Sequence, residues 1–338
     1  MSFLPYFFKA YSFNFKYLSL YNTIYILNLK IMNSNEQIYY LQPVFRPPSE
    51  ANSLLIQLTE GCTFKCDFCM SNLRKHFKVR EVDDVKRDID VAKRKFGNFV
   101  YKLFFLDGNA MVTPFNKLLE VTQYAMDTLP NLERVGVYAH AKDILKKSDR
   151  QLKDLSEAGL KIAYVGFETG YNELLQEVNK NATKEDFIEA AKKLMRADIT
   201  LSATFINGLG GANRPDISVL HAEESADLVN KICPEDDRIW YIAFLTLMMP
   251  QGTEIYRRKA TGLFTEMTSR EILQELKIFI NKINFHNKSA QCIFRSNHAS
   301  NYLPIKGTLE HDKEKILSVL NYGLTHDDIL RPEFYRAL

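Results

Sequence analysis

The sequence has few cysteines, glycines and prolines, and almost no net charge over its 338 residues. Five cysteines are too few for a disulfide scaffold, and their odd number favours a reducing compartment, so we expect a cytoplasmic protein. With only 14 glycines and 11 prolines, collagen-like and low-complexity classes are excluded. Three lysines in residues 1–31 account for the net charge of +3. The remainder therefore shows no basic excess of the kind that binds nucleic acid, and we expect no nucleic-acid partner.

Long apolar runs are also missing. Residues 1–31 are rich in Phe and Tyr, but their longest uncharged stretch, residues 17–29, has only 13 residues. A bilayer crossing needs about 20 mostly apolar residues, so we expect no stable membrane insertion. The segment also lacks the small-residue cleavage site of a signal peptide. We interpret residues 1–31 as an N-terminal extension outside the core, with an interfacial anchor as the alternative, followed by a lead-in segment at 32–50.

Short apolar runs alternate with helical patterns from residue 53 onward, as in a parallel sheet with crossover helices. The apolar runs predict six strands, at residues 53–58, 102–106, 134–138, 162–167, 200–206 and 241–247. A period of 3.6 residues predicts helices at 82–95, 116–128, 142–158, 184–197, 217–231 and 253–260. Six strand–helix repeats in this order predict an α/β fold, a partial parallel (β/α)6 barrel over residues 51–285. A doubly wound sheet is the alternative.

The rest of the chain, residues 286–338, is expected to be a short mixed extension that closes the barrel. A long helical stretch at 269–284 leads into it, and a strand-like run follows at 291–294. Helical segments are predicted at 309–320 and 327–330. Ligands gather at the carboxyl ends of the strands in either fold, so the residues that follow each strand are the first candidates for a site.

Three of the five cysteines form the strongest motif in the chain. Cys62, Cys66 and Cys69 have the spacing C-x3-C-x2-C. Thiolates bind both iron–sulfur clusters and zinc, but a structural zinc site normally takes four ligands in paired C-x2-C spacings. His76 could complete such a site. A [4Fe–4S] cluster on three cysteines leaves one iron open to an outside ligand, and we predict that cluster, with zinc as the alternative.

This cysteine loop after the first strand, with Phe68 before the last cysteine, resembles the radical S-adenosylmethionine (radical SAM) superfamily. The resemblance implies two cofactors, a [4Fe–4S] cluster and S-adenosylmethionine, whose methionine amino and carboxylate groups bind the open iron. It also implies reductive cleavage to a 5′-deoxyadenosyl radical, which abstracts hydrogen from a substrate. A reductant such as flavodoxin or ferredoxin would be the partner that supplies the electron.

Residues at other strand ends carry the resemblance across most of residues 53–252. Asp107, Gly108 and Asn109 follow the second strand, where family members have a Gly-Gly-Glu-like stretch that binds the methionine amino group. This chain departs from that stretch, and Asp107 is the residue available for the role. The segment 165–180 is similar to the fourth-strand segment of the Elongator catalytic subunit, methylthiotransferases and oxygen-independent coproporphyrinogen oxidase. It implies that Glu168 binds the cofactor, although an acid there also suits a helix N-terminus.

Two further segments complete the resemblance. Residues 197–211 resemble the fifth-strand segment that supports the adenine, which places Ile206 in the cofactor site. Residues 247–250 resemble the sixth-strand segment whose backbone meets the adenine, which places Met248 there as well. Both segments also have a purely structural interpretation. The glycines at 208–211 are residues that ordinary turns use, and residues 247–250 fit a strand that ends in a proline turn.

Polar side chains are dense directly after the run at 291–294. We hypothesise that Arg295, His298 and Asn301 fold across the barrel mouth and contact the substrate. A polar turn capped by its own side chains is the alternative. Residues 295–302 resemble a signature of uncharacterised radical SAM proteins, which assigns no reaction.

The sequence therefore predicts a radical SAM enzyme with an unidentified substrate. An activity like that of coproporphyrinogen oxidase, an RNA-modifying activity and a non-enzymatic zinc-binding protein are the alternatives. Cys233 and Cys292 cannot ligate a second complete cluster, which argues against sulfur donation of the methylthiotransferase type. Basic pairs such as Lys146-Lys147 sit among acids and are interpreted as solvated helix faces.

Overall fold

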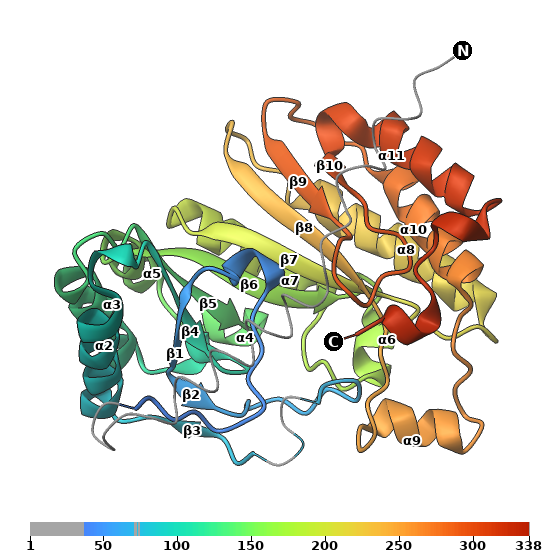
Figure 1. The fold of residues 1–338 in the computed structure, drawn as a ribbon. Helices are drawn as coiled ribbons and strands as arrows, with labels where there is room; N and C mark the ends of the chain where they lie inside the picture. The colour runs from blue at the N-terminus through green and yellow to red at the C-terminus, as the bar shows by residue number, and fades with distance from the viewer. Residues whose placement is uncertain (1–36, 71–72, 74, 338) are drawn as a thin grey trace. The chain divides into compact units, whose positions relative to one another are not determined.

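The strands of the main sheet follow one another in the order in which they occur in the chain (Figure 1). The computed structural model describes residues 37–70, 73 and 75–337, so the extension expected at residues 1–31 lies outside the described residues. Residues 1–40 and 41–338 form two separate units, and every element named below belongs to the second. The sheet contains β1 (Leu54–Gln57), β4 (Lys102–Leu106), β5 (Arg134–Ala139), β6 (Leu160–Glu168), β7 (Thr200–Asn207), β8 (Ile239–Thr246), β9 (Gln291–Arg295) and β10 (Lys306–Thr308).

Neighbouring strands from β1 to β9 are parallel, and β10 is antiparallel to β9. The strand order never reverses, whereas a doubly wound sheet has a point where it does. The predicted partial parallel barrel with a mixed C-terminal extension is confirmed. A separate two-stranded sheet, β2 (Thr59–Glu60) with β3 (Lys78–Val79), brackets the cysteine loop and was not predicted, because each strand has only two residues.

Helices follow the strands because each has one apolar stripe that packs on the sheet. They are α2 (Val82–Phe96), α3 (Phe115–Thr128), α4 (Ala141–Leu145), α5 (Asp149–Glu157), α6 (Asn172–Glu177), α7 (Lys184–Arg196), α8 (Pro215–Lys231), α9 (Glu254–Ala260), α10 (Ser269–Lys282) and α11 (Leu309–Gly323). Short 3₁₀ turns lie at η2 (Pro48–Glu50), η3 (Gly97–Phe99), η4 (Ala110–Val112), η5 (Asp327–Ile329) and η6 (Glu333–Tyr335). None of the helices described is long and apolar enough to cross a membrane.

The single helix predicted at 142–158 is wrong, because the chain breaks there into α4 and α5. Ser148 and Gln151 form a capping box, which starts a new helix. Lys147 lies at the break and is buried, so the prediction of a solvated Lys146-Lys147 pair is wrong for Lys147. Its Nζ donates to the carbonyls of Met111 at 2.8 Å and Thr113 at 3.1 Å, and burial lowers its pKa to about 8.

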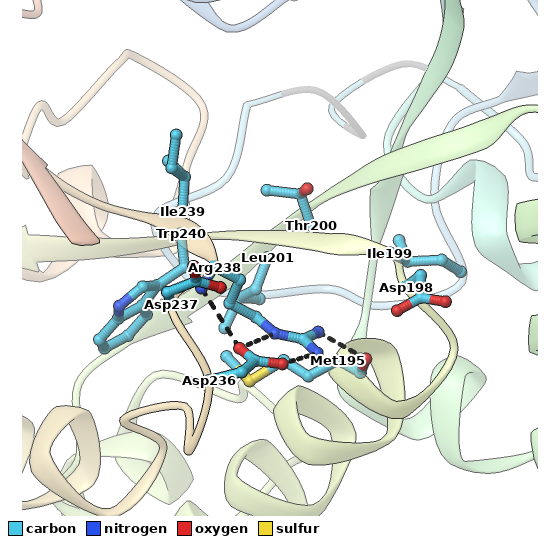
Figure 2. A pocket seen from close by; sticks show the side chains of 10 residues that line it. All are labelled: Met195, Asp198, Ile199, Thr200, Leu201, Asp236, Asp237, Arg238, Ile239 and Trp240. Carbon is cyan, nitrogen blue, oxygen red and sulfur yellow. Dashed lines mark hydrogen bonds and ion pairs between the residues drawn. The ribbon is translucent and has the colours of Figure 1, made fainter. Parts of the chain in front are cut away.

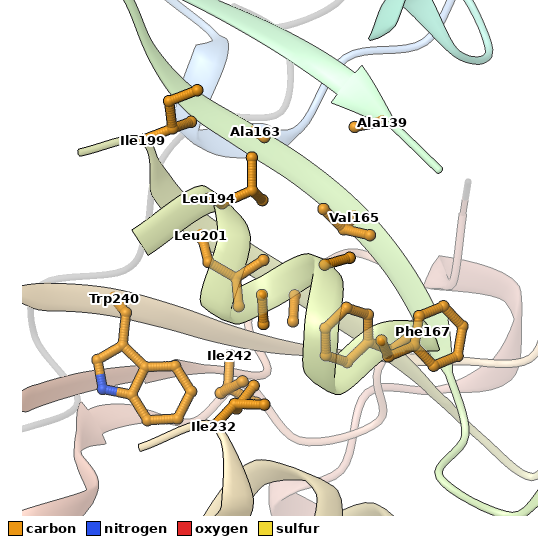
Figure 3. Packing of buried hydrophobic residues seen from close by; sticks show 14 of the residues in the cluster. Ala139, Ala163, Val165, Phe167, Leu194, Ile199, Leu201, Ile232, Trp240 and Ile242 are labelled. Atoms are coloured by element: carbon orange, nitrogen blue, oxygen red, sulfur yellow. The ribbon is translucent and has the colours of Figure 1, made fainter. Parts of the chain in front are cut away.

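Side chains alternate between the two faces of the sheet. On the outer face, Val165, Phe167 and Leu201 pack with Leu194 of α7 in the buried core, as Figure 3 shows. On the inner face of β8, every second residue is only part-buried. The outer face therefore holds the helices, while the inner face and the carboxyl edge of the sheet are left for ligands.

A buried acid ties the loop after β7 to helices α8 and α10. Glu275 of α10 accepts hydrogen bonds from the amide of Gly208 at 2.7 Å and from Ser218 Oγ at 2.5 Å. His221 Nε2 lies 3.6 Å from Glu275 Oε1. Burial raises the pKa of Glu275 to about 7, although the two hydrogen bonds oppose the shift. Burial also lowers the pKa of His221 to about 4, so the histidine is neutral at physiological pH.

We predict that Glu275→Gln changes how stability depends on pH. Because the pKa of Glu275 rises from 4.5 to about 7 on folding, the folded chain keeps a proton that the unfolded chain releases. The stability that Glu275 contributes is therefore lost as the pH rises through this window. Glutamine does not titrate. The unfolding free energy of the variant should therefore rise, relative to that of wild type, as the pH increases through this window. Urea unfolding measures it, with the exposed Glu314→Gln as control, and parallel pH profiles for all three proteins would contradict it.

Candidate functional site

The three cysteines lie on the loop that follows β2, beside the carboxyl end of β1. Cys62, Cys66 and Cys69 are each part-exposed. The loop is shaped by its own hydrogen bonds: the amide of Phe64 donates to Cys62 Sγ at 3.5 Å, and the amide of Cys69 to the Cys66 carbonyl at 3.0 Å. The loop therefore presents three thiols near the edge where ligands of this fold class bind.

The loop after β4 packs directly against the cysteine loop. A Cβ atom on Gly108 would lie 2.6 Å from the Gly61 carbonyl oxygen and 2.7 Å from Cys62 Cβ. Real Cβ atoms do not approach other atoms so closely, so only glycine lets the two backbones meet here. The position of Cys62 is thus set by contact with the loop after β4.

Asp107 holds these two loops together. Its Oδ1 accepts from the amide of Gly108 at 2.7 Å, and its Oδ2 accepts from Lys75 Nζ at 2.5 Å and from the amide of Gly61 at 3.3 Å. Both side chains of the Lys75–Asp107 pair are almost fully buried. The carboxylate expected to bind a methionine amino group is therefore already engaged by an amine from this chain. Lys75 was not predicted, because no pattern singles it out in the sequence.

Asn109 joins the loop after β4 to the end of β5. Its Nδ2 donates to Asp143 Oδ2 at 2.6 Å, and its Oδ1 accepts from the amide of His140 at 3.1 Å. The side chain is buried, and these two bonds give it a structural role at the edge of the site.

His140 supports the cysteine loop from the end of β5. Its ring stacks on Phe64, with ring centres 3.6 Å apart. Nδ1 accepts from the amide of Lys142, so we assign the proton to Nε2, which lies 3.0 Å from the Lys180 carbonyl oxygen. Burial lowers the pKa of His140 to about 3, so the ring is neutral. This residue was missed, although its place after the third predicted strand was a signal for it.

Glu168 and Lys180 form a buried ion pair near Cys66. Their Oε1 and Nζ atoms are 2.7 Å apart, and a Cβ on Gly166 would lie 2.1 Å from Glu168 Oε1 and 3.0 Å from Lys180 Nζ. Glu168 has a left-handed backbone, with φ of 65°. Burial raises the pKa of Cys66 to about 12, while the charge of Lys180 lowers it and that of Glu168 raises it. Lys180 belongs to the segment that resembles the family, but it was not predicted as a site residue.

A small apolar cluster lies beside the cysteine loop and unites three separate segments. Phe68 packs against a cluster that contains Ile206 and Leu247. These residues come from the cysteine loop, β7 and the end of β8. Met248 Sδ accepts a hydrogen bond from Arg336 at 3.1 Å. The residues expected around an adenine are thus close to one another, with an arginine among them that was not predicted.

The turn after β9 is anchored to the end of β8. Asn301 Nδ2 donates to the Phe244 carbonyl at 2.8 Å, and its Oδ1 accepts from Thr246 Oγ1 at 3.0 Å. The side chain is buried, so Asn301 fastens the turn. The turn therefore lies beside the carboxyl end of β8.

Arg295 and His298 have fewer partners than Asn301. The Arg295 guanidinium lies 5.2 Å from the centre of the Tyr241 ring on the inner face. No acidic group lies within ion-pair distance of Arg295 in the described part of the chain. His298 Nδ1 bonds within its own turn, to the amide and hydroxyl of Ser300. Burial lowers the pKa of His298, which keeps the ring neutral at physiological pH.

A cavity of about 290 Å³ lies elsewhere, at the amino ends of β7 and β8 (Figure 2). Asp198, Asp236 and Asp237 line it, and Arg238 bonds to Asp236 and to the Met195 carbonyl. It contains neither the cysteines nor any other predicted site residue. We therefore place the candidate site at the opposite, carboxyl edge.

The donor set of the cysteine loop fits an iron–sulfur cluster. Within the residues that the structure describes, no three Cys, His, Asp or Glu side chains surround a single ion position. A [4Fe–4S] cluster does not need that arrangement, because each of its thiolates binds a different iron. The three thiols are part-exposed on one loop, which suits a group bound from outside the fold. His76, the fourth ligand in the zinc alternative, is exposed.

Comparison with known proteins agrees with this fold. Residues 56–222 match the model of the radical SAM superfamily. The chain is 25% identical over 186 residues to tRNA-2-methylthio-N(6)-dimethylallyladenosine synthase of Clostridium botulinum, covering 52% of this chain and 39% of that protein. It is 28% identical over 153 residues to anaerobic magnesium-protoporphyrin IX monomethyl ester cyclase of Cereibacter sphaeroides, covering 45% and 24%. The chain thus spans well under half the length of these relatives.

The fold is also that of a solved structure, coproporphyrinogen III oxidase from Escherichia coli, a radical SAM enzyme. The TM-score is 0.50 at 12% identity, over 68% of this chain and 52% of that chain, which shows the fold alone. The protein is an α/β partial barrel with a three-cysteine loop at its carboxyl edge. Its residues 56–222 are a domain of the radical SAM superfamily, whose members are enzymes that use a [4Fe–4S] cluster and S-adenosylmethionine.

We predict that Gly108→Ala displaces the cysteine loop. The added methyl would lie 2.6 Å from the Gly61 oxygen, so one of the two loops must move. We expect a loss of about 1–3 kcal/mol in stability and less iron per chain after anaerobic reconstitution, measured by iron and sulfide analysis. Gly262→Ala is the control, because nothing lies within 4 Å of its added Cβ and only the left-handed backbone is strained. Wild-type iron content in Gly108→Ala would contradict the prediction.

Proposed function

We propose that Cys62, Cys66 and Cys69 hold a [4Fe–4S] cluster and that the protein is an active radical SAM enzyme. When bound, the cluster supplies the electron that cleaves S-adenosylmethionine reductively and yields a 5′-deoxyadenosyl radical, which abstracts hydrogen from a substrate. The observation that carries the proposal is the placement of three part-exposed thiols on one loop, packed against Gly108, at the ligand-binding edge of the sheet. A flavodoxin or ferredoxin is the proposed reductant, in the cytoplasm.

The residues around the cysteines take separate parts in this proposal. Phe68, Ile206 and Met248 supply the adenine side. The apolar cluster beside the cysteine loop supports this part for Phe68 and Ile206. Glu168 contacts the ribose or methionine part, held in place by Lys180. The loop of Asp107, Gly108 and Asn109 faces the methionine. Since Asp107 is bonded to Lys75, it acts there by shaping the loop.

The substrate side of the proposal consists of the inner face and the turn after β9. Arg295 has no acidic partner within the described chain and stacks on Tyr241, which favours a substrate with an anionic group. Neutral His298 offers a ring nitrogen to the same side, while Asn301 fixes the turn. The reaction after hydrogen abstraction stays unassigned, because the relatives differ in reaction and are matched over less than half their length.

We predict that the reconstituted wild type forms 5′-deoxyadenosine. The test is anaerobic incubation with dithionite and S-adenosylmethionine, followed by mass spectrometry. Replacing Cys62, Cys66 and Cys69 together by alanine should abolish the product, because the thiolates that bind iron are gone. Cys292→Ala, at a buried cysteine on β9, is the control and should retain it. No product from wild type, with zinc bound in place of iron, would overturn the proposal in favour of the zinc-binding alternative.

We also predict that Arg295→Ala and His298→Ala reduce substrate turnover. With a small-metabolite extract as the source of substrate, the stimulated rate of 5′-deoxyadenosine formation should fall at least about tenfold for Arg295→Ala, as expected for the loss of a charged hydrogen bond. The iron content should not change. Asn297→Ala, at an exposed position in the same turn, should behave like wild type. If all three variants respond to the extract as wild type does, the turn has no part in substrate binding.

A further inference from the structure

Arg336, near the end of the chain, is one of the most completely enclosed charged groups in the structure. Its guanidinium has no exposed surface and lies 4.2 Å from the centre of the Tyr302 ring. Nε donates to the Ser300 carbonyl at 2.7 Å, and Nη1 donates to the Tyr302 hydroxyl at 2.6 Å. One edge of the guanidinium therefore holds the turn after β9.

The other edge of the same guanidinium holds the end of β8. Nη2 donates to the Leu247 carbonyl at 3.1 Å and to Met248 Sδ at 3.1 Å. The amide of Leu247 in turn donates to the Asn207 carbonyl, at the end of β7, at 2.9 Å. Through these bonds Arg336 connects the C-terminal segment to the ends of two neighbouring strands.

Burying the charged guanidinium of Arg336 costs desolvation free energy, which a side chain that only fills space would not cost. Its carboxylate partner within 3 Å is Glu333, which is 65% exposed, while the guanidinium is fully buried. An apolar side chain would fill the same space without the desolvation of a cation. A planar guanidinium, however, can bond two backbone carbonyls, a hydroxyl and a sulfur in fixed directions at once. The geometry therefore favours a role in fixing positions over a role in stability.

What Arg336 fixes is the wall of the candidate cofactor site. The Leu247 side chain belongs to the apolar cluster that also contains Ile206 and packs against Phe68 of the cysteine loop. A displacement of the Leu247 backbone would therefore change both the wall and its distance from the cysteines. No other arginine described here bonds to Leu247 or Met248.

We propose that Arg336 is a positioning residue for S-adenosylmethionine: it acts through the Leu247 carbonyl and the Met248 side chain and does not contact the reacting atoms. The proposal rests on the proposed function above. It predicts that loss of the guanidinium weakens cofactor binding without loss of the cluster, because the cysteine loop has its own supports in Gly108, Asp107 and His140.

The test compares Arg336→Lys with Arg331→Lys. Arg331 is the matched control, since it bonds to the carbonyls of His298, Ala299 and Asn301 in the same turn but does not reach β8. Two measurements are made beside iron content. Equilibrium dialysis with labelled S-adenosylmethionine gives the affinity of the reconstituted protein, and hydrogen–deuterium exchange without the cofactor reports on residues 244–250.

We expect Arg336→Lys to keep the wild-type iron content, to weaken S-adenosylmethionine binding at least about tenfold, and to speed exchange at residues 244–250. Arg331→Lys should show neither of the last two effects. Equal affinity in wild type and Arg336→Lys would overturn the positioning role while leaving the proposed function intact. If wild type itself binds no S-adenosylmethionine, the proposed function fails and the positioning role fails with it.

A second variant covers the case in which Arg336→Lys does not fold. Glu333→Gln removes the nearer carboxylate partner of Arg336 from the solvent side, where the change is more easily tolerated, and leaves Glu266 at 3.9 Å. It should shift the same two measurements in the same direction by a smaller factor. The proposal would be overturned if Glu333→Gln showed unchanged affinity and unchanged exchange while Arg336→Lys was only unstable. Arg336 would then be a stabilising contact.

Discussion

The contact between Gly108 and the backbone of Gly61 and Cys62 determines where the cysteine loop can lie. Two loops that follow neighbouring parallel strands meet there without a side chain between them. Asp107 then closes the junction, because one carboxylate accepts from amides of both loops and from Lys75. A further support comes from the neighbouring strand, because the ring of His140 at the end of β5 stacks on Phe64 of the cysteine loop. The cysteine loop, which has little secondary structure of its own, is thereby held by the edge of a rigid sheet.

Two buried carboxylates near the cysteines have ammonium partners, Asp107 with Lys75 and Glu168 with Lys180. A third, Asp67, accepts a hydrogen bond from the neutral amide of Asn179 at 2.6 Å. Removing one member of such a pair leaves an uncompensated buried charge, which costs about 3–5 kcal/mol. These pairs therefore bring polar groups close to the thiols without a net charge. Arg295 differs from them, because it has no acid within reach in the described residues, and that difference is the basis for proposing an anionic substrate.

Local patterns predicted much of the fold, and the family resemblance supplied candidates for the site. The six strands follow from apolar runs, since a strand buried in a parallel sheet is apolar on both faces. The break at Ser148 was missed because helical periodicity continues through it, and only the capping box marks it. The resemblance named Glu168 and Ile206, whereas Lys75 and Arg336 were not predicted. Their partners are distant in the chain, 32 residues away for Lys75 and up to 89 for Arg336, so no local pattern contains them.

The central claim is that three cysteines leave one iron open for S-adenosylmethionine. Electron–nuclear double resonance on the reduced, reconstituted protein tests it most directly, with cofactor labelled by ¹⁵N in the amino group or ¹⁷O in the carboxylate. We predict hyperfine coupling from both labels in wild type, because both groups would bind the open iron. A [4Fe–4S] signal without coupling from either label, in protein saturated with the cofactor, would contradict the claim.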